Sequence, residues 1–272
     1  MRILMSGSEY LSKEKKGFTL LELSIVIVII GIIVAGVTAG QALVKQAKLR
    51  SGVSEYNTFS QAFAAFKLQY NSLPGDLSNA SSYWGSAHNG DGNKKIEDRY
   101  PTVGYPGTNF EYRGENMYMW EHLGSGRAKL LPGNYNGRDI YLSGFGGGTV
   151  QSELPASSFG SYWGVAYDYN RNKNYFVTGA TTPSISIDYT TNNILRPKDA
   201  IYVDSKIDDG MPYSGRVIAT SLAGNYPINN PTYSNVSSNN VCTTGTAGSV
   251  DKAAVYNISN SNVSCSLIME VN

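Results

Sequence analysis

The sequence Lys15-Lys16-Gly17-Phe18-Thr19-Leu20-Leu21-Glu22 opens the longest apolar run of the chain, which continues to about Gly40. Between Phe18 and Gly40, Glu22 is the only ionisable residue. A helix rises about 1.5 Å per residue, so residues 18–40 span about 34 Å, enough to cross a hydrocarbon core of ~30 Å. We therefore predict a transmembrane helix over residues 18–40.

The charges that flank this run set its orientation. Lys13, Lys15 and Lys16 precede it, and the first charged residue after it is Lys45. Because basic residues beside a membrane helix tend to stay in the cytoplasm, we predict a cytoplasmic N-terminus. The bulk of the chain then lies on the other side of the membrane.

Gly17 is placed differently from the cleavage site of an ordinary signal peptide. A secretory signal ends its apolar core in a small-residue site, whereas Gly17 precedes the apolar core. Cleavage after Gly17 would therefore leave the helix on the protein. The alternative is an uncleaved single-pass anchor with a chance glycine. The true start could also be Met5 rather than Met1.

The string Lys-Gly-Phe-Thr-Leu-Leu-Glu of residues 16–22, with Ser-Ile-Val-Ile-Val-Ile-Ile of residues 24–30, resembles the processing site and first helix of type IV prepilins and of type II secretion pseudopilins. The resemblance covers about residues 13–60. It implies that prepilin peptidase, a membrane-embedded aspartic peptidase, cuts after Gly17. It also implies N-methylation of the new Phe18 amine. Residues 1–17 are then a leader peptide.

Glu22 is a costly residue for a membrane helix, because an ionised carboxylate near the helix centre in lipid costs about 2.5–3.5 kcal/mol. Its place near the edge lowers this cost. After cleavage, Phe18 carries a free amine four residues away, and positions i and i+4 share a helix face, so the two charges could pair within one subunit. The resemblance favours a pair with the Phe18 amine of a neighbouring subunit, which would set the axial stagger. A glutamate that snorkels or stays protonated is the remaining alternative.

Beyond Gly40 the apolar residues recur at spacings of three and four, which is typical of one face of an amphipathic helix. Glu55 is among the residues of the opposite, solvated side. Pro74 and the turn sequence Gly75-Asp76 end the pattern, so we predict one helix over residues 18–72. The apolar stripe that should pack on the head consists of Leu49, Val53, Tyr56, Phe59, Phe63, Phe66 and Tyr70.

Residues 73–272 form the predicted exported head, in which short apolar runs alternate with turn residues, a pattern typical of β-structure. Two short helices are predicted over Asn116–Leu131 and Pro197–Asp208. The fold class is α+β and pilin-like: one long N-terminal helix packed on an antiparallel β-sheet. The predicted strands are Gly164–Tyr169, Asn174–Thr178, Ser184–Asp188, Gly215–Thr220, Ala253–Ile258 and Cys265–Met269.

Charge and motif content argue against several classes of protein. The chain has a formal net charge of +1, and the leader carries four basic and two acidic residues, which leaves −1 on the mature chain. No basic stripe indicates nucleic-acid binding. The sequence contains no GxSxG, GxxxxGK[ST] or HExxH motif. Of its two histidines, we interpret His122 as a packed or surface residue rather than a catalytic base.

Cys242 and Cys265 are the only cysteines and lie in the exported part of the chain. An even number of cysteines in an exported protein favours a disulfide. The bridge would tether the C-terminal strand to the loop before it. Free thiols or a metal pair are poor alternatives, because no CxxC motif or histidine cluster accompanies the cysteines.

Two acidic segments are candidates for calcium. Asn89, Asp91 and Asn93 place oxygen ligands at alternate positions, which resembles the first half of an EF-hand-type loop. The second half departs from that pattern, since the sixth position is Lys94 rather than glycine and the twelfth is Tyr100 rather than glutamate. Asn-Gly-Asp-Gly-Asn is also an ordinary turn sequence.

The second acidic segment has Asp204, Asp208 and Asp209 before Gly210. Their helical spacing could gather carboxylates on one side of a helix end. An ordinary helix end explains the same residues without a metal.

These observations predict a structural protein rather than an enzyme: a pilin-like subunit that polymerises into a type IV pilus-type filament, for adhesion, motility or DNA uptake. The implied partners are copies of itself and related pilins, prepilin peptidase and an inner-membrane assembly platform. The chain would be a single-pass inner-membrane protein before assembly and part of an extracellular pilus or periplasmic pseudopilus afterwards. The alternatives are a type II secretion pseudopilin and a membrane-tethered exported binding protein that never polymerises.

Overall fold

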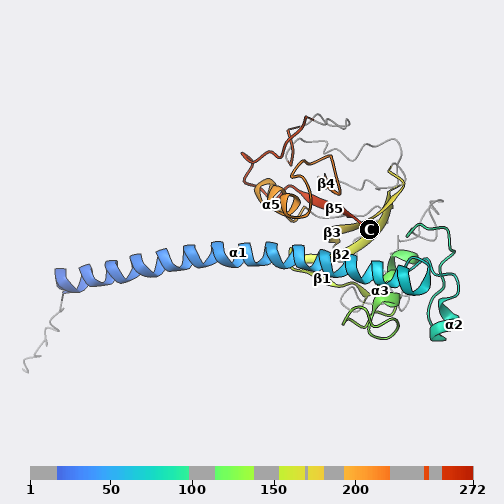
Figure 1. Cartoon of the computed structure of the whole chain (residues 1–272). Helices are drawn as coiled ribbons and strands as arrows, with labels where there is room; N and C mark the ends of the chain where they lie inside the picture. Colours follow the sequence, from blue (N-terminus) through green and yellow to red (C-terminus); the bar gives the residue numbers. More distant parts are fainter. Residues whose placement is uncertain are drawn as a thin grey trace, which may run out of the picture. The chain divides into compact units, whose positions relative to one another are not determined.

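The computed structural model describes residues 17–97, 114–137, 153–168, 171–180, 193–220, 242–244 and 253–271 (Figure 1). The chain divides into two compact units, Met1–Gln46 and Ala47–Asn272. Residues 1–16 of the predicted leader and the predicted strand Ser184–Asp188 lie outside the described residues. The architecture is the predicted α+β, pilin-like one, with a long N-terminal helix and a curled antiparallel sheet.

Helix α1 runs over Leu20–Tyr70, close to the predicted span. It begins after Thr19, and it ends at Tyr70 because Asn71 takes a left-handed backbone with φ of 51° just before Pro74. Within the first unit, α1 is long and apolar enough to cross a membrane. From Ala47 onwards, α1 belongs to the second unit and carries the stripe that packs on the head.

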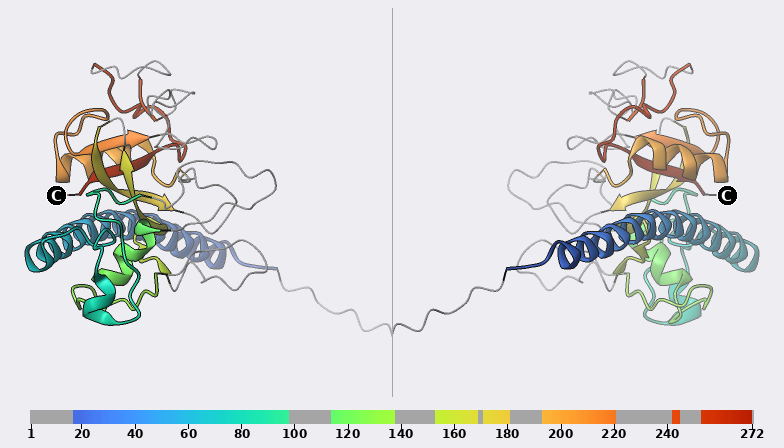
Figure 2. Two further views of the ribbon diagram at one scale, coloured as in Figure 1. Left: turned by 90° about the vertical axis from the view of Figure 1, so that its right-hand side faces the viewer. Right: turned by 90° about the vertical axis from the view of Figure 1, so that its left-hand side faces the viewer.

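The predicted stripe of α1 is confirmed. Leu49, Tyr56, Phe59, Phe63 and Phe66 are buried, and the other two stripe residues pack against them while partly exposed. The part of α1 in the second unit lies with the sheet on one side and α2 (Ala80–Trp84) and α3 (Glu115–Leu123) on the other, as Figure 2 shows. This stripe therefore holds the head together.

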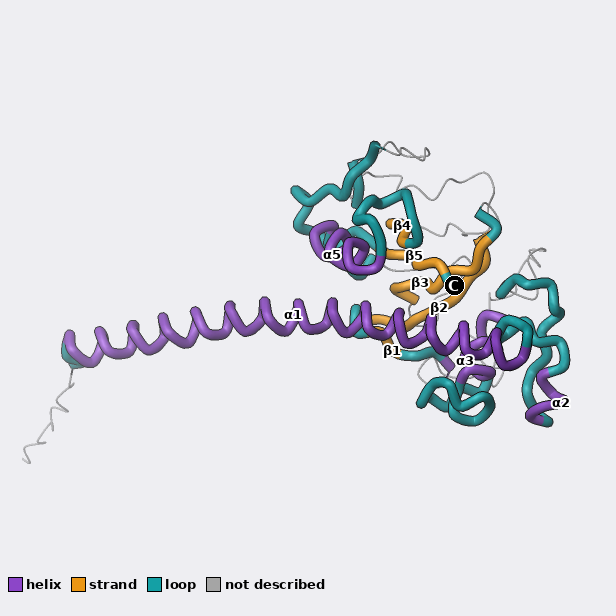
Figure 3. Tube along the Cα trace, viewed as in Figure 1, coloured by secondary structure: helices purple, strands orange, loops and turns teal. Residues whose placement is uncertain are grey.

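Among the described residues, five antiparallel strands form one sheet, in the order β1-β2-β3-β5-β4 (Figure 3). Four of them correspond to predicted strands, whereas β1 was not predicted. The predicted strand Ala253–Ile258 is wrong: only Tyr256 pairs there, in an isolated bridge with Thr243, because the chain turns again at Ile258. The strands are β1 (Ala156–Ser157), β2 (Ser161–Asp168), β3 (Lys173–Ala180), β4 (Val217–Thr220) and β5 (Ser266–Glu270).

Both faces of this sheet are covered. Phe176 and Met269 are directly paired and point to the face that carries α1, while their neighbours Val177 and Ile268 pair on the opposite face. That opposite face is closed by Tyr213 from a connecting segment. Because both faces are buried, β3 and β5 carry apolar residues at consecutive positions instead of at alternate ones.

Two further helices were predicted. The predicted helix Pro197–Asp208 corresponds to α5 (Pro197–Ile207), with proline in its first turn. The predicted helix Asn116–Leu131 is too long, since α3 ends at Leu123. There Ser125 leaves the helical pattern and donates its N–H to the Gly133 carbonyl at 2.7 Å. The glycine-rich sequence after Leu123 turns the chain back instead of extending the helix.

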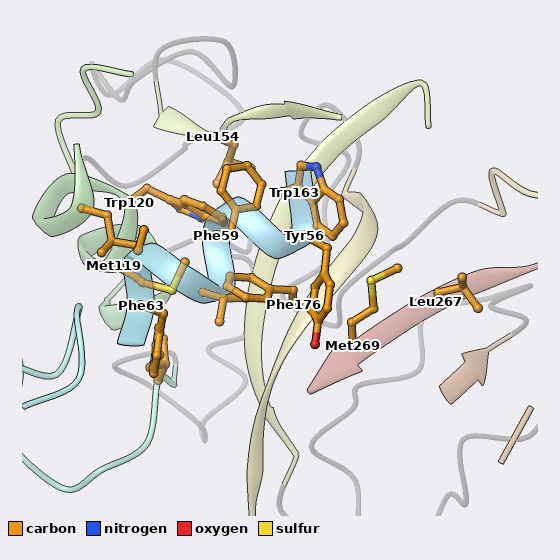
Figure 4. Close-up of a cluster of buried hydrophobic side chains, with 14 of the residues drawn as sticks. Tyr56, Phe59, Phe63, Met119, Trp120, Leu154, Trp163, Phe176, Leu267 and Met269 are labelled. Atoms are coloured by element: carbon orange, nitrogen blue, oxygen red, sulfur yellow. The ribbon is translucent and has the colours of Figure 1, made fainter. Parts of the chain in front are cut away.

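The core at the α1–sheet contact is aromatic (Figure 4). Phe59 meets Trp120 of α3 and Trp163 of β2 edge to face, with ring centroids 5.2 and 5.6 Å apart. Tyr56 meets Phe176 of β3 in the same manner at 6.1 Å. Such pairs each add about 0.5–1.5 kcal/mol beyond the area they bury. Residues from α1, α3 and the sheet thus share one cluster.

Glu55 does not lie on the solvated side as predicted. Its Oε2 accepts a hydrogen bond from the Trp163 indole N–H at 2.8 Å, and its carboxylate also accepts from the Ser158 hydroxyl and N–H. The next residue, Tyr56, donates its hydroxyl to the Glu270 carbonyl at 2.9 Å. Two consecutive residues of α1 are therefore bonded to β2 and β5, a role that helical periodicity alone does not reveal.

The structure joins Cys242 and Cys265 by a disulfide, 23 residues apart in sequence. Cys265 lies directly before β5 and pairs with Leu195 in an isolated bridge. Replacing Cys242 with serine is expected to lower the free energy of unfolding by roughly 3–4 kcal/mol, because the unfolded chain regains the entropy of the open loop. Denaturant unfolding of the detergent-solubilised full chain checks this. An equal midpoint for variant and parent would contradict it.

Candidate functional site

The predicted cleavage region and the first turn of α1 form the first candidate site. Gly17, Phe18 and Thr19 precede the helix, and Thr19 caps it. The Thr19 N–H and hydroxyl both donate to Oε2 of Glu22, at 2.8 and 2.9 Å, and the Glu22 N–H donates back to the hydroxyl at 3.2 Å. This reciprocal pattern is a capping box. The signature Thr-x-x-Glu in the sequence was a signal for it that the prediction did not use.

The second feature of this region is that the side chains of its apolar run are exposed. Phe18 is 90% exposed and Leu20 88% exposed, and large apolar side chains remain exposed as far as Val44. A Cβ placed on Gly31, Gly36 or Gly40 would meet nothing within 4 Å. A soluble monomer rarely exposes apolar surface over so many consecutive residues. The segment therefore requires lipid or other protein around it.

Three carboxylates from separate segments converge in the head. Asp76 follows α1, Asp91 lies in the loop after α2, and Glu115 is the first residue of α3. Each offers an oxygen within 4.8 Å of the others. Asp76 and Glu115 are buried, at 1% and 6% exposed, whereas Asp91 is exposed. We call these residues the acidic triad.

Burial governs the electrostatics of the acidic triad. It raises the pKa of Glu115 to about 8, helped by the nearby charges of Asp76 and Asp91, and it also raises the pKa of Asp76. Removing a carboxylate from water disfavours its charged form, and neighbouring carboxylates do the same. Within the described residues, no lysine, arginine or histidine forms an ion pair with the triad.

The sequence-predicted ligands of this loop are only partly brought together. Asp91 belongs to the triad, but Asn89 lies against α2, where its amide bonds the N–H and hydroxyl of Ser81. The Asn93 amide donates to Asp91 and to Glu97, at 2.9 Å each. Sequence reasoning missed Asp76 and Glu115, because they are distant in sequence and converge only through the fold.

The second acidic segment is brought together, and hydrogen bonds account for its carboxylates. Asp204 accepts from the Tyr256 hydroxyl at 2.7 Å, and Asp208 accepts from the Arg216 N–H. Asp209 accepts from the Ser214 hydroxyl at 2.6 Å. These bonds close the end of α5 onto the following turn. The cluster therefore has a structural role that needs no metal.

His122 is fully buried in α3 and connects two loops. Its Nδ1 accepts the Gly75 N–H at 2.8 Å, and its Nε2 lies 2.8 Å from the His88 carbonyl. An N–H only donates and a carbonyl only accepts, so the ring is neutral with its proton on Nε2. Burial lowers the pKa of His122 from 6.5 to about 4. The interpretation as a packed residue agrees with this position.

The buried neutral histidine predicts a loss of stability in mild acid. The pKa of His122 is lower in the folded state than in the unfolded state, so protons bind preferentially to the unfolded chain. The stability that the neutral His122 contributes is therefore fully present above pH 6.5 and is lost as the pH falls towards 4. At ~1.4 kcal/mol per unit of pKa difference, the loss in the free energy of unfolding amounts to about 3 kcal/mol. Histidine NMR titration of the detergent-solubilised chain checks the pKa, and pH-dependent unfolding of His122→Gln should show a weaker slope. A His122 ring that titrates near 6.5 would contradict the assignment.

Comparison with known proteins identifies the N-terminal segment. Residues 12–38 match the family model of the prokaryotic N-terminal methylation motif, which is the cleavage and methylation signal of type IV prepilins and pseudopilins. No curated protein and no solved structure matches the chain. The matched segment supports a type IV pilin-like or pseudopilin-like exported protein, and the motif points to a structural class rather than to an enzyme.

Proposed function

We propose that the chain is a structural subunit that polymerises into a type IV pilus-type filament after its leader is removed. Prepilin peptidase cuts between Gly17 and Phe18, and the Phe18 amine is methylated. The chain waits in the inner membrane as a single-span protein, and an assembly platform there moves it into the filament. The exposed apolar surface from Phe18 to Val44, joined to the methylation motif, is the observation that carries this proposal.

The apolar surface explains why extraction from the membrane requires polymerisation. In the bilayer, lipid covers these side chains. Outside it, a Leu, Ile or Val side chain left fully in water forfeits about 1.5–3 kcal/mol relative to burial. The large exposed apolar side chains of the segment are 49% to 90% exposed, so each forfeits a substantial part of that free energy. The same helix of a neighbouring subunit has the length and the apolar composition needed to bury this surface. Gly31, Gly36 and Gly40, with open space around them, allow close approach of another helix.

Glu22 supplies the directional element of this assembly. Both hydrogen bonds that the Glu22 carboxylate accepts from Thr19 end on Oε2, so Oε1 can accept from a second donor. Cleavage converts the Phe18 N–H into an amine that can carry a positive charge. A pair between Glu22 of one subunit and the Phe18 amine of the next removes an unpaired charge from an apolar interior and sets the stagger between subunits.

The size of the head favours a surface pilus over a secretion pseudopilus. About 200 residues follow the helix, with a covered two-sided sheet and a disulfide. A pseudopilin would have the same processing site and the same Glu22, but its filament would stay in the periplasm. We propose that the filament extends from the cell surface, where the head can take part in adhesion, motility or DNA uptake.

Crosslinking in intact cells tests polymerisation against a monomeric tether. Formaldehyde-treated cells are expected to yield a ladder of oligomers of the processed chain. A matched variant in which Glu22 is replaced by alanine should lose the ladder while the monomer band persists. A processed chain that remains monomeric under conditions that crosslink another oligomeric membrane protein would refute the proposal.

A further inference from the structure

Hydrogen bonds within the head do not satisfy every carboxylate oxygen of the acidic triad. Among the described residues, Oδ1 of Asp76 has no hydrogen-bond partner although the side chain is only 1% exposed. Its other oxygen, Oδ2, accepts the Lys94 N–H at 2.9 Å. A buried carboxylate oxygen without a donor is costly, so a partner that brings positive charge is expected there.

The other two members of the triad are held close to Asp76 by the backbone. The Asp91 N–H donates to Oε1 of Glu115 at 2.8 Å, and the Glu115 N–H donates to the Glu97 carbonyl at 3.2 Å. These bonds fasten the loop after α2 to the start of α3. Asp91 and Glu115 are thereby fixed so that each places a carboxylate oxygen within 4.8 Å of an oxygen of Asp76.

Two glycines permit this approach. Gly75 has a φ of 91°, and a Cβ on it would collide with the Glu115 carbonyl oxygen. A Cβ on Gly90 would collide with the backbone of Asp76. The turn after α1, the loop after α2 and the start of α3 therefore touch backbone to backbone. Side chains at either glycine would push the three carboxylates apart.

We propose that Asp76, Asp91 and Glu115 form a calcium site that ties the turn after α1 to the loop after α2 and to the start of α3. Ligands that are all oxygen select a hard cation such as Ca²⁺ or Mg²⁺. Ca²⁺ takes six to eight oxygens in flexible geometry, which suits carboxylates from three irregular segments. Asp91 is exposed, so water reaches the site and completes the coordination.

The choice of ligands differs from the one that the loop sequence suggests. Asn89 is occupied with Ser81, and the Asn93 amide supports Asp91 rather than pointing an oxygen at the triad. The second acidic segment is satisfied by N–H and hydroxyl donors, as described above. The proposal concerns the head alone and does not depend on polymerisation, so failure of either leaves the other standing.

Calorimetric titration of the chelator-treated, detergent-solubilised full chain with CaCl₂ tests the proposal directly. One Ca²⁺ per chain is expected to bind, together with a rise in the melting temperature of the head. The titration should extend to about 10 mM, tenfold above the weakest class of extracellular calcium sites. Absence of binding in that range would overturn the proposal, and so would an equal affinity for MgCl₂.

Two variants and one control locate the site. Asp76→Asn and Asp91→Asn should each weaken Ca²⁺ binding by at least about tenfold, the lower end of what even a supporting group contributes to a metal site. Asp91 is exposed, so its variant remains informative if Asp76→Asn does not fold. Asp209→Asn, an exposed carboxylate of the other acidic segment, should bind as the parent does. Parent-like affinity in Asp91→Asn, or an equal loss in Asp209→Asn, would refute the assignment.

Discussion

Replacing Gly17 with leucine is expected to abolish filaments while the chain still inserts into the membrane. Prepilin peptidase must accept the residue before the cut, and a bulky side chain there blocks that access. A Cβ on Gly17 meets nothing within 4 Å in the chain itself, so the defect should come from recognition by the peptidase and not from misfolding. Immunoblots should show only the full-length chain in membranes, and sheared fractions should contain none.

The uncut chain has two physical obstacles to assembly. The lysines of the leader stay attached to the helix, and no Phe18 amine exists to pair with Glu22. The same substitution at Gly7, ten residues upstream, is a matched control that should be processed and assembled normally. Normal filaments built from full-length Gly17→Leu chains would contradict the role given to cleavage.

Replacing Glu22 with alanine is expected to remove filaments at a later step. The chain should insert and be cut after Gly17, and insertion should become easier because the cost of a carboxylate in lipid disappears. Assembly should fail, because the neighbour's amine then enters the apolar interior without a partner. Sheared filaments are compared at equal amounts of processed, membrane-bound subunit. A filament yield like that of the parent would remove the intersubunit role.

Glu22→Gln separates this role from the capping box. Glutamine can still accept from the Thr19 N–H and hydroxyl, so the cap survives, but the charge is lost. We expect this variant to assemble as poorly as Glu22→Ala. If Glu22→Gln assembles and Glu22→Ala does not, the cap is what matters. If Glu22 paired only with its own Phe18 amine, the loss would be about 0.2–0.5 kcal/mol and neither variant would assemble poorly.

The sequence was most informative where physical constraints are local. The apolar run from Phe18, the stripe that includes Tyr56 and Phe66, and the proline at the start of α5 are all periodic or positional signals, and the structure follows them. The resemblance at residues 16–30 agrees with the match to the methylation motif. These features depend on neighbours along the chain, which a single sequence displays.

Features that depend on contacts between distant segments were predicted less well. Glu55 has helical spacing on a polar face, yet it is bonded to Trp163 more than a hundred residues away. The acidic triad combines Asp76 and Glu115 with one residue of the predicted loop. The run around Tyr256 looks like a strand, but only one residue finds a partner. Sequence pattern alone could not specify these three outcomes.

The composition of sheared surface filaments tests the central claim most directly. Mass spectrometry of filaments sheared from the cell surface should find this chain, with an N-terminal peptide that begins at Phe18 and carries one methyl group on its amine. Finding the chain only in the membrane fraction, monomeric and with residues 1–17 still attached, while no sheared filament contains it, would contradict the account.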